Sequence, residues 1–417
     1  MNINVFPSIV KGEIQAPASK SMLQRAIVAA FLADEKVQIE GFSSSADVLA
    51  ALELVKALGA DFRIKESTLV IEPNFESKTR ALSIGESGLG MRLFSPLLAL
   101  YDQEFLLQAD GTLQKRPLHL IEKVLSQQGV KCSSSNGYAP LRICGPLQGG
   151  DFEMDASEGS QLLSGLLMTL PKLKKDSVIR VKHLKSKPYI DMTISLLKAF
   201  GIIIENENYS RFIIGGNQKY KANRYGVEGD WSGAAFLLVA AAINGSIQLN
   251  NLRMDSLQGD KNIVDVLHQV GAIIIQEENS IYVEKTKLTA FDYDATETPD
   301  LFPPLAALAA SCKGVSRIKG VHRLIHKESN RAAAIQTIFD QLGLNLRIEG
   351  DEMLIASGDC QGGQISSFND HRMAMMGTVL ALNAKNAVQI TEAESIRKSY
   401  PNFYADMIRI GVNINEV

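Results

Sequence analysis

Several common signatures are scarce or absent in this sequence. Its 417 residues contain four cysteines, which are widely spaced and form neither a CxxC pair nor a His/Cys cluster with zinc-ligand spacing. We therefore expect reduced thiols and no metal site. The formal net charge is −3, which argues against a general basic surface for nucleic acid.

Long apolar runs are also missing. The run 234–243 is too short to cross a bilayer, and the N-terminal MNINVFPSIVKGEI lacks the basic and apolar regions of a secretory signal. The sequence contains no Walker motif, no GxGxxG strand–helix fingerprint and no Ser-His-Asp order that would indicate another class of enzyme. We expect a cytoplasmic, monomeric chain with no cofactor and no nucleic-acid or membrane partner.

What the sequence does contain is an internal repeat. Five helix-like segments end in a glycine, and these glycines are 70 or 72 residues apart. Glycine just past a helix suits the left-handed C′ position. After each glycine, two apolar alternating segments surround a polar break, which predicts a β-hairpin. The glycines are Gly59, Gly129, Gly201, Gly271 and Gly343.

A sixth copy is divided between the chain ends. Gly411 follows 68 residues after Gly343, but only one strand-like segment, GVNINEV, remains after it. The N-terminal MNINVFPS is a strand without a partner in its own copy. We therefore predict that the termini lie close together and complete one another. The chain would then form six α/β units in two sets of three.

The units contain helix-like segments at 21–32, 90–100, 159–170, 231–243 and 371–382. Several of them begin at a motif with small or polar residues, where free backbone N–H groups attract anions. At the first start, APASKSMLQRA, the side chains of Lys20, Ser21 and Arg25 would form a cradle for phosphate or carboxylate. The alternative for each such motif is capping or turn chemistry, and capping is the expected role of Asp230.

Cations recur at the unit boundaries, whereas few acids lie among them. The acids that stand out are Asp300 in TPDLFPP and Glu328 in KESNR. Many cations with few acids suit the binding of small, multiply charged anions and proton transfer between them.

Taken in order, the motifs resemble the 3-phosphoshikimate 1-carboxyvinyltransferases, also called EPSP synthases. They are PxSKSxxxRA, GxxGxxMR, RP, SQ, SKPYIDM, VEGD, PD, KESxR, DHRMAM and KSYPxF, and they run from residue 17 to 403. The nearest rival is the family that acts on UDP-N-acetylglucosamine. That family typically has KN where this chain has Lys20-Ser21, and it has a reactive cysteine in a Gly-rich loop. Neither Cys132 nor Cys144 lies in a comparable loop.

The resemblance implies an inside-out α/β barrel of two domains, each built from three similar α/β units. One domain would be 19–228, the other 1–18 plus 229–417, with the active site in the cleft between them. It also implies a reaction of the shikimate pathway to chorismate and aromatic amino acids. The 5-hydroxyl of shikimate 3-phosphate adds to carbon 2 of phosphoenolpyruvate, and the tetrahedral intermediate loses inorganic phosphate.

Family roles carry over where residues match. Asp300 would accept the 5-hydroxyl proton, while Glu328 with Lys20 would move protons at the methylene carbon. The implied ligands of shikimate 3-phosphate are Lys20, Ser21, Arg25, Ser160, Gln161, Ser186, Tyr189, Asp300 and Lys327. The implied ligands of phosphoenolpyruvate are Lys20, Gly88, Arg116, Gln161, Arg331, Arg372 and Lys398.

Some positions depart from the family pattern. Glu86 stands where asparagine is common, and a carboxylate there would repel phosphoenolpyruvate unless it is paired or turned away. The other departures are Leu89, Gly159, Trp231, Arg323 and Asn330. They keep a further alternative open, an anion-binding homologue with weakened catalysis.

Overall fold

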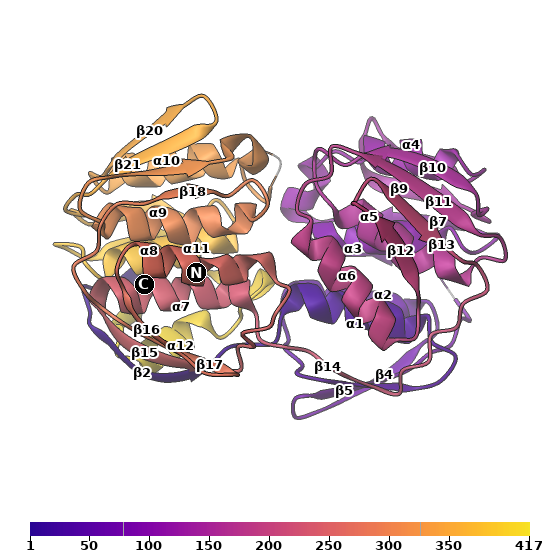
Figure 1. The fold of residues 1–417 in the computed structure, drawn as a ribbon, viewed down its shortest axis with the longest axis horizontal. Coiled ribbons are helices and arrows are strands. Elements are labelled where there is room, and N and C mark those ends of the chain that lie inside the picture. Colours follow the sequence, from indigo (N-terminus) through magenta and orange to yellow (C-terminus); the bar gives the residue numbers. More distant parts are fainter. Residues whose placement is uncertain (78, 326) are drawn as a thin grey trace. The chain divides into compact units, whose positions relative to one another are not determined.

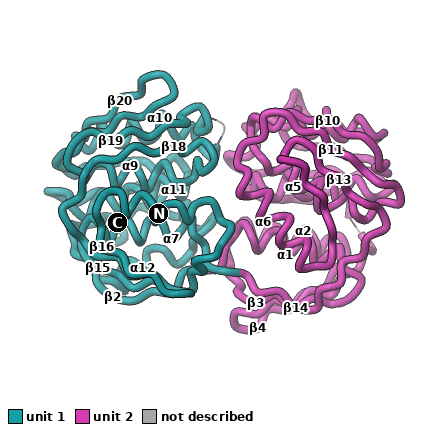
Figure 2. Tube along the Cα trace, viewed as in Figure 1, with its two compact units in different colours: residues 1–17, 228–417 teal, residues 18–227 magenta. Residues whose placement is uncertain are grey.

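The chain forms two compact units. The computed structural model describes residues 1–77, 79–325 and 327–417, so His326, next to the KESNR motif, lies outside the described residues. Unit 1 comprises Met1–Pro17 and Glu228–Val417, and unit 2 comprises Ala18–Val227 (Figure 2). The chain therefore passes from one unit to the other twice.

Within the described residues, six four-stranded sheets repeat one topology (Figure 1). In each, two parallel strands lie beside an antiparallel pair, which is a hairpin in five of the sheets and is formed by β1 and β24 in the sixth. One example in unit 2 runs β10 (Asp151–Asp155), β11 (Ser177–Lys182), β13 (Arg211–Ile214) and β12 (Ile204–Glu207), with β10 and β11 parallel. The prediction of six α/β units, three in each set, is confirmed, and with it the fold class.

The other sheets follow the same order. In unit 2 they are β14 (Arg224–Gly226), β3 (Val37–Glu40), β5 (Thr68–Glu72) and β4 (Asp61–Lys65), and β6 (Ala81–Ser83), β7 (Glu104–Gln108), β9 (Tyr138–Cys144) and β8 (Lys131–Ser135). In unit 1, the first sheet runs β22 (Gly363–Ser366), β23 (Val388–Thr391), β1 (Ile3–Val5) and β24 (Ile414–Glu416). The second sheet runs β2 (Val10–Gln15), β15 (Gly245–Asn250), β17 (Ser280–Glu284) and β16 (Ile273–Gln276). The third sheet runs β18 (Asp292–Asp294), β19 (Val315–Lys319), β21 (Glu352–Ala356) and β20 (Asn345–Glu349).

The spacing glycines adopt the conformation that was predicted for them. The five glycines and Gly411 have φ between 71° and 114°, and a hairpin follows each of the five. An L-residue with a Cβ is disfavoured at these angles, which is why the sequence repeats glycine there.

The sixth unit joins the two ends of the chain. Strand β1 lies between β23 and β24, with Ile3 opposite Glu416 and Val5 opposite Ile414. Both termini lie in unit 1 (Figure 2). The prediction that the termini complete one another is confirmed.

The chain crosses between the units twice, and the last strand before each crossing pairs with a strand of the unit that the chain is leaving. Strand β2 pairs in parallel with β15 of unit 1, and the chain then enters α1 (Lys20–Phe31) of unit 2. Strand β14 pairs in parallel with β3 of unit 2 before the chain returns to α7 (Trp231–Asn244) of unit 1. Each crossing thus begins directly after a paired strand, close to a helix start.

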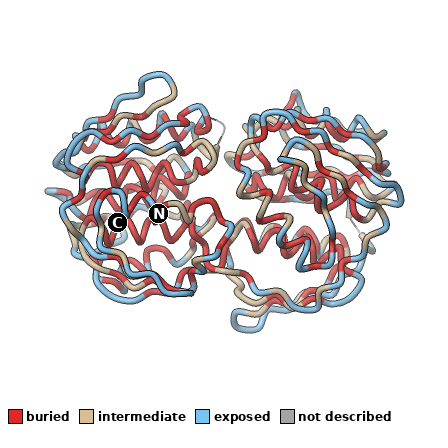
Figure 3. Tube along the Cα trace, viewed as in Figure 1, coloured by how far each residue is buried: buried red, intermediate tan, exposed pale blue. Residues whose placement is uncertain are grey.

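Helices that are apolar on every side form the core of each unit. In α7 every residue but Ser232 and Asn244 is buried, which a helix surrounded by other elements requires (Figure 3). In unit 1 it contacts α9 (Phe302–Ser311) and α11 (His371–Ala381). In unit 2, α1 contacts α3 (Gly88–Leu98), and α3 contacts α5 (Gln161–Thr169).

The remaining helices complete the repeats. They are α2 (Ala46–Ala57), α4 (His119–Ser126) and α6 (Pro188–Ala199) in unit 2, and α8 (Ile263–Gln269), α10 (Arg331–Gln341) and α12 (Phe403–Arg409) in unit 1. Short 3-10 turns are η1 (Gly111–Lys115), η2 (Leu170–Lys172), η3 (Gly259–Asn262), η4 (Pro299–Leu301), η5 (Val321–Leu324) and η6 (Ala393–Lys398). Among the described residues, no helix has the length and apolarity needed to cross a membrane.

Candidate active site

Many of the predicted site residues lie at the N-terminal ends of the core helices. In unit 2, α1 begins at Lys20, α3 at Gly88, and α5 at Gln161 with Ser160 as its N-cap. In unit 1, Arg372 lies in the first turn of α11. Helix starts present backbone N–H groups and a partial positive charge, so these ends favour anions.

Arg25 is a buried cation whose hydrogen bonds all go to neutral oxygens. Its side chain is 1% exposed. The guanidinium donates to the Ser21 hydroxyl and carbonyl (2.7 and 2.9 Å), to the Thr193 hydroxyl (2.8 Å), to the Ser164 hydroxyl (3.3 Å) and to the Tyr189 carbonyl (3.5 Å). Burial lowers the pKa of Arg25 to about 10.

This arrangement leaves Arg25 without a carboxylate at ion-pair distance among the described residues. A buried charge without a countercharge is costly, so an anionic ligand nearby would stabilise it. Arg25 also links α1 to Tyr189 in α6, which brings three residues predicted to bind one ligand into a single network.

Lys20 is held at the start of α1 by an acid that the sequence did not single out. Its Nζ lies 2.8 Å from Asp47 Oδ2, and both side chains are largely buried. Gln24 donates to the Asp47 carbonyl (2.9 Å) and the Ser87 hydroxyl (2.7 Å), which ties the starts of three helices together. Asp47 lies in the first turn of α2, where an acid also suits helix capping, so the sequence does not distinguish the two roles.

Gly88 and Arg116 are brought together. A Cβ on Gly88 would overlap Arg116 Nη1, so only glycine lets the guanidinium lie against the start of α3. Arg92 fixes the same junction, donating to the Gly88 carbonyl (3.1 Å) and the Pro117 carbonyl (3.2 Å). A cation thus stands beside a helix N-terminus, which is the arrangement expected of an anion site.

Glu86, the unexpected acid, is paired. Its Oε2 accepts hydrogen bonds from the Thr112 N–H (2.8 Å) and the Thr112 hydroxyl (3.0 Å). The carboxylate thereby connects the loop before α3 to η1, which directly precedes Arg116. Glu86 is therefore held in place by two hydrogen bonds from neutral groups of Thr112.

The other departing residues take structural positions. Leu89 and Trp231 are buried in α3 and α7. Asn330 caps α10 by accepting from the Ala333 N–H (3.3 Å). Arg323 Nη1 donates to the Thr296 carbonyl (2.8 Å). Gly159 has φ +140°, and it directly precedes Ser160 at the α5 N-cap.

In unit 1, Asp300 lies among three cations. Arg331 Nη1 is 2.7 Å and Lys327 Nζ 3.4 Å from its Oδ1, while Arg372 Nη2 is 3.1 Å from its Oδ2. Burial by itself would raise the pKa of Asp300, but Arg372, Lys327 and Arg331 outweigh burial and hold this pKa well below its ordinary value.

Arg331 in turn contacts three acids. In addition to Asp300, its Nη2 lies 2.6 Å from Glu328 Oε2 and its Nε lies 2.8 Å from Asp370 Oδ2. Arg331 is 1% exposed and Asp370 is fully buried. Burial would lower the pKa of Arg331, yet the charges of Asp370, Glu328 and Asp300 hold it well above the ordinary value.

Asp370, like Asp47, is a functional candidate that the sequence reasoning missed. It precedes His371 in NDHRMAM and caps α11 by accepting from the Arg372 N–H (3.0 Å), which is what an aspartate before a helix predicts. Its second contact, to Arg331, joins residues far apart in the chain. The only sign of the Arg331–Asp370 contact in the sequence is that it contains both KESNR and NDHR.

The remaining predicted residues lie close to these groups in their own units. Lys398, in η6, is buried and donates to the Asn369 carbonyl (2.8 Å), next to the start of α11. Ser186 is buried with φ +61°, just before α6. The predicted residues thus form one group in unit 2 and one in unit 1.

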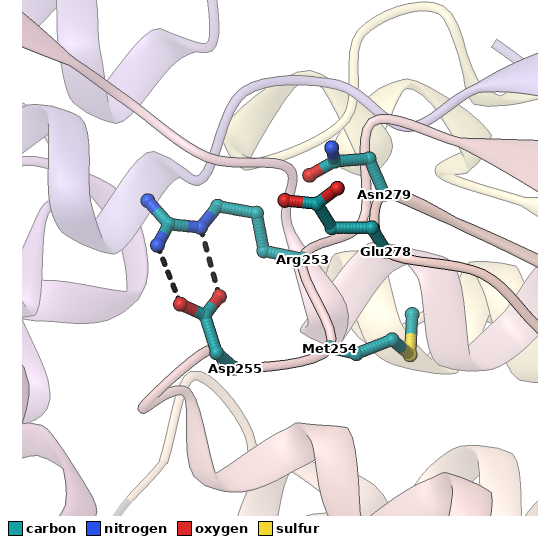
Figure 4. A pocket seen from close by; sticks show the side chains of 5 residues that line it. All are labelled: Arg253, Met254, Asp255, Glu278 and Asn279. Atoms are coloured by element: carbon teal, nitrogen blue, oxygen red, sulfur yellow. Dashed lines mark hydrogen bonds and ion pairs between the residues drawn. The ribbon is translucent and has the colours of Figure 1, made fainter.

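A surface pocket in unit 1 contains none of the predicted residues. Figure 4 shows its lining of Arg253, Met254, Asp255, Glu278 and Asn279. Within it, Arg253 donates two hydrogen bonds to Asp255 (2.9 and 2.7 Å), so its main cation is neutralised. This pocket contributes nothing to the candidate site.

Comparison with known proteins gives one consistent family. Residues 6–407 match the family model described as EPSP synthase (3-phosphoshikimate 1-carboxyvinyltransferase). A 3-phosphoshikimate 1-carboxyvinyltransferase from Clostridium beijerinckii is 36% identical, over 98% of this chain and 97% of that protein. One from Clostridium perfringens is 37% identical, with the same coverage.

Solved structures agree on the fold. An EPSP synthase from Acinetobacter baumannii has a TM-score of 0.84 at 24% identity, covering 100% of both chains. An enolpyruvyl transferase from Streptomyces tendae has a TM-score of 0.79 at 15% identity, covering 99% of this chain and 98% of its own. With the match to residues 6–407, these findings show that the chain belongs to the EPSP synthase family.

Proposed function

We propose that this chain transfers the enolpyruvyl group of phosphoenolpyruvate to the 5-hydroxyl of shikimate 3-phosphate. The products are 5-enolpyruvylshikimate 3-phosphate and inorganic phosphate, on the route to chorismate and the aromatic amino acids. The observation that carries the proposal is the cluster of Asp300, Lys327, Arg331 and Arg372, which combines a carboxylate with three cations. Membership of the EPSP synthase family supports it. A cytoplasmic, monomeric enzyme is part of the same proposal.

The two groups of residues would act on the same pair of substrates. In unit 2, the network around Arg25 suits shikimate 3-phosphate, with Ser21, Ser160, Ser186 and Tyr189 as hydroxyl donors. Gln161, at the start of α5, and Lys327 of unit 1 would complete this set.

The cations would hold phosphoenolpyruvate. Its carboxylate and phosphate lie close together, so taking it out of water requires several charged donors. Arg331 and Arg372 in unit 1, with Arg116 beside Gly88 in unit 2, are such donors. Lys20, Gln161 and Lys398 complete the proposed set.

Binding of phosphoenolpyruvate, the enolpyruvyl donor, would also activate the base, Asp300. While Arg331, Arg372 and Lys327 surround Asp300, its low pKa makes it a poor proton acceptor. The donor's negative charges would compete for the two arginines, so the proton affinity of Asp300 would rise as the donor binds. A base that becomes effective only beside the donor avoids protonation at other times.

The proton transfers then balance. Asp300 accepts the 5-hydroxyl proton as that oxygen bonds to carbon 2, and the methylene carbon gains a proton from Glu328 or Lys20. In the second step this carbon returns a proton to Glu328 or Lys20, the bond from carbon 2 to the phosphate oxygen breaks, and inorganic phosphate leaves with the proton that Asp300 had accepted. Glu328 Oε2 lies 2.6 Å from Arg331 Nη2, and this contact holds Glu328 next to the proposed phosphoenolpyruvate site.

A two-acceptor assay tests the function. Phosphate release is measured with phosphoenolpyruvate and either shikimate 3-phosphate or UDP-N-acetylglucosamine. We expect turnover with the first acceptor and none with the second. Turnover with only the nucleotide sugar would contradict the proposal. Calorimetric binding of shikimate 3-phosphate without any turnover would favour the anion-binding homologue.

The Glu86 contact gives a prediction about donor affinity. Glu86→Ala removes both hydrogen bonds to Thr112 and should loosen the loop that leads to Arg116. At about 1 kcal/mol for each hydrogen bond, KM for phosphoenolpyruvate should rise about 5- to 30-fold. KM for shikimate 3-phosphate should change less than about twofold. Steady-state kinetics with each substrate varied in turn measures the difference.

Two controls accompany this variant. Glu86→Gln retains one acceptor oxygen and should have an intermediate KM for phosphoenolpyruvate. Glu104→Ala removes an exposed acid of unit 2 that pairs with Arg142, and it should change neither constant. A lower KM for phosphoenolpyruvate in Glu86→Ala would instead mean that repulsion by the carboxylate dominates.

A further inference from the structure

The tip of the hairpin between β12 and β13 carries a residue that the mechanism above does not use. Tyr209 has φ +58°, in the left-handed region, which a bulky side chain rarely adopts. Asn206 helps to hold the turn, because its Oδ1 accepts a hydrogen bond from the Tyr209 N–H (2.8 Å). A backbone conformation of this kind persists only where the surroundings fix it. The Tyr209 side chain is therefore expected to have partners that hold it.

The Tyr209 hydroxyl contacts a carboxylate at the start of α6. It lies 2.9 Å from Oδ1 and 3.0 Å from Oδ2 of Asp191, which is in the first turn of that helix and is partly buried. Among the described residues, no other side chain donates a hydrogen bond to Asp191. A carboxylate that is partly withdrawn from water needs such a donor. Tyr209 thus attaches the hairpin tip to the helix start.

The ring of Tyr209 makes a second contact to the same helix start. Lys187, the N-cap residue of α6, has its Nζ over the ring, 5.4 Å from the ring centroid. A cation in this position is attracted by the negative face of the ring. Asp191 and Lys187 are also joined directly, since the Asp191 N–H donates to the Lys187 carbonyl (3.2 Å). One side chain therefore holds the first turn of α6 at two points.

That turn carries two of the predicted ligands of shikimate 3-phosphate. Ser186 directly precedes Lys187, and Tyr189 lies between Lys187 and Asp191 in the sequence. The Tyr189 N–H donates to the Ser186 carbonyl (3.2 Å), and the Tyr189 carbonyl accepts from Arg25 (3.5 Å). Ser186 itself has φ +61°, so its conformation also depends on its neighbours. A shift of the α6 start would therefore displace both side chains.

A neighbouring repeat makes a corresponding contact with its backbone. At the tip of the β8–β9 hairpin, the Gly137 carbonyl accepts from the N–H of Leu118, the N-cap residue of α4 (2.8 Å). That helix start follows Arg116, a predicted ligand of phosphoenolpyruvate. In two repeats of unit 2, a hairpin tip thus holds the segment that leads from a predicted ligand into a helix. In the β12–β13 repeat, the side chain of Tyr209 makes this contact.

We propose that Tyr209 is a positioning residue that keeps Ser186 and Tyr189 in place to bind shikimate 3-phosphate. The inference rests on the proposed function, because it takes these two residues to be ligands of the acceptor. Groups that are fixed in advance lose less conformational freedom when a ligand binds, so they bind it more tightly. Tyr209 moves no proton in the proposed reaction, so its loss should affect the affinity for the acceptor rather than the rate of the chemical step.

The first test compares the Michaelis constants of the two substrates. Tyr209→Phe removes the hydroxyl but keeps the ring beside Lys187, so KM for shikimate 3-phosphate should rise about 3- to 10-fold. KM for phosphoenolpyruvate and kcat should change less than about twofold. Tyr138→Phe removes the hydroxyl of a 43% exposed tyrosine in β9 and is the matched control, with all three constants unchanged. An unchanged KM for shikimate 3-phosphate in Tyr209→Phe, or an equal rise in both KM values, would overturn the inference.

Variants of the carboxylate test whether the Tyr209–Asp191 contact is responsible. Asp191→Ala should raise KM for shikimate 3-phosphate about as much as Tyr209→Phe. Asp191→Asn keeps an oxygen that can accept from the hydroxyl, so it should raise this KM less. The double variant Tyr209→Phe/Asp191→Ala should be no worse than either single variant, because all three lack the same contact. Increases that multiply in the double variant would show that the two residues act independently, and would overturn the role of the contact.

A binding measurement does not depend on turnover. Calorimetric titration of shikimate 3-phosphate without phosphoenolpyruvate should give a Kd about 3- to 10-fold higher for Tyr209→Phe than for the unmodified protein. Equal Kd values would overturn the role of Tyr209. The expected difference in Kd without any phosphate release would support that role and contradict the proposed reaction. If the unmodified protein did not bind shikimate 3-phosphate at all, the proposed function would be contradicted, and the inference with it.

Discussion

Asp300→Ala should lose most of its turnover without losing affinity for phosphoenolpyruvate. The variant removes the proposed base, which typically contributes on the order of 10²–10⁴-fold to the rate. It also removes a carboxylate that holds Arg331 and Arg372, so these arginines become more available to the donor. We therefore expect kcat to fall by about 10²–10⁴-fold while KM for phosphoenolpyruvate stays constant or decreases. Phosphate-release kinetics measures both constants.

Control variants separate this effect from a general loss of structure. Asp359→Ala removes a 76% exposed acid of unit 1 and should retain full activity. Glu328→Gln keeps the shape of the proposed second acid and should also lose most of its kcat. Normal turnover in both Asp300→Ala and Glu328→Gln would show that the acid–base roles are assigned to the wrong residues.

Asp370→Asn should destabilise the protein more than any surface charge change. Asparagine retains a helix-capping oxygen for α11, so the variant removes mainly the charge opposite Arg331. Breaking a buried ion pair by neutralising one partner costs about 3–5 kcal/mol when the other charge is left without a countercharge. Arg331 keeps its contacts to Glu328 and Asp300, so denaturant unfolding should show a smaller decrease, about 1–3 kcal/mol. The remaining acids would draw Arg331 toward themselves, so KM for phosphoenolpyruvate should rise as well.

An exposed ion pair provides the comparison. Glu352→Gln breaks the contact to Arg317, whose side chain is about half exposed, and should cost about 1 kcal/mol or less. If Asp370→Asn were no more destabilising than Glu352→Gln, the Arg331–Asp370 contact would not be important for stability. If KM for phosphoenolpyruvate were unchanged, Asp370 would not position Arg331 for the donor.

The repeat and the paired termini could be predicted because they rest on local rules. A left-handed residue after a helix favours glycine, so the turns are visible as glycines at regular spacing. Strands show alternation of apolar residues, and an unpaired strand at each end implies that the two meet. The helix-capping role of Asp230 at the start of α7 could be predicted because capping is also a local rule. Asp230 accepts a hydrogen bond from the Gly233 N–H (3.0 Å).

The partners of the charged residues depended on the tertiary structure. Asp47, Asp260 and Asp370 all lie close to helix starts, where an acid has an ordinary local explanation. Their contacts to Lys20, Ser232 and Arg331 cross 27, 28 and 39 residues of chain. Sequence spacing carries no information about which charges meet over such separations.

The sequence by itself thus determined the repeated unit, the joined termini and the kinds of side chain that occupy the site. Only the tertiary structure decided which acid faces which cation. The physical reason is that backbone preferences act over a few residues, whereas the charge state of a buried group depends on every charge around it. Arg331 shows this most clearly, because KESNR predicts a cation at that place but not the three carboxylates that surround it.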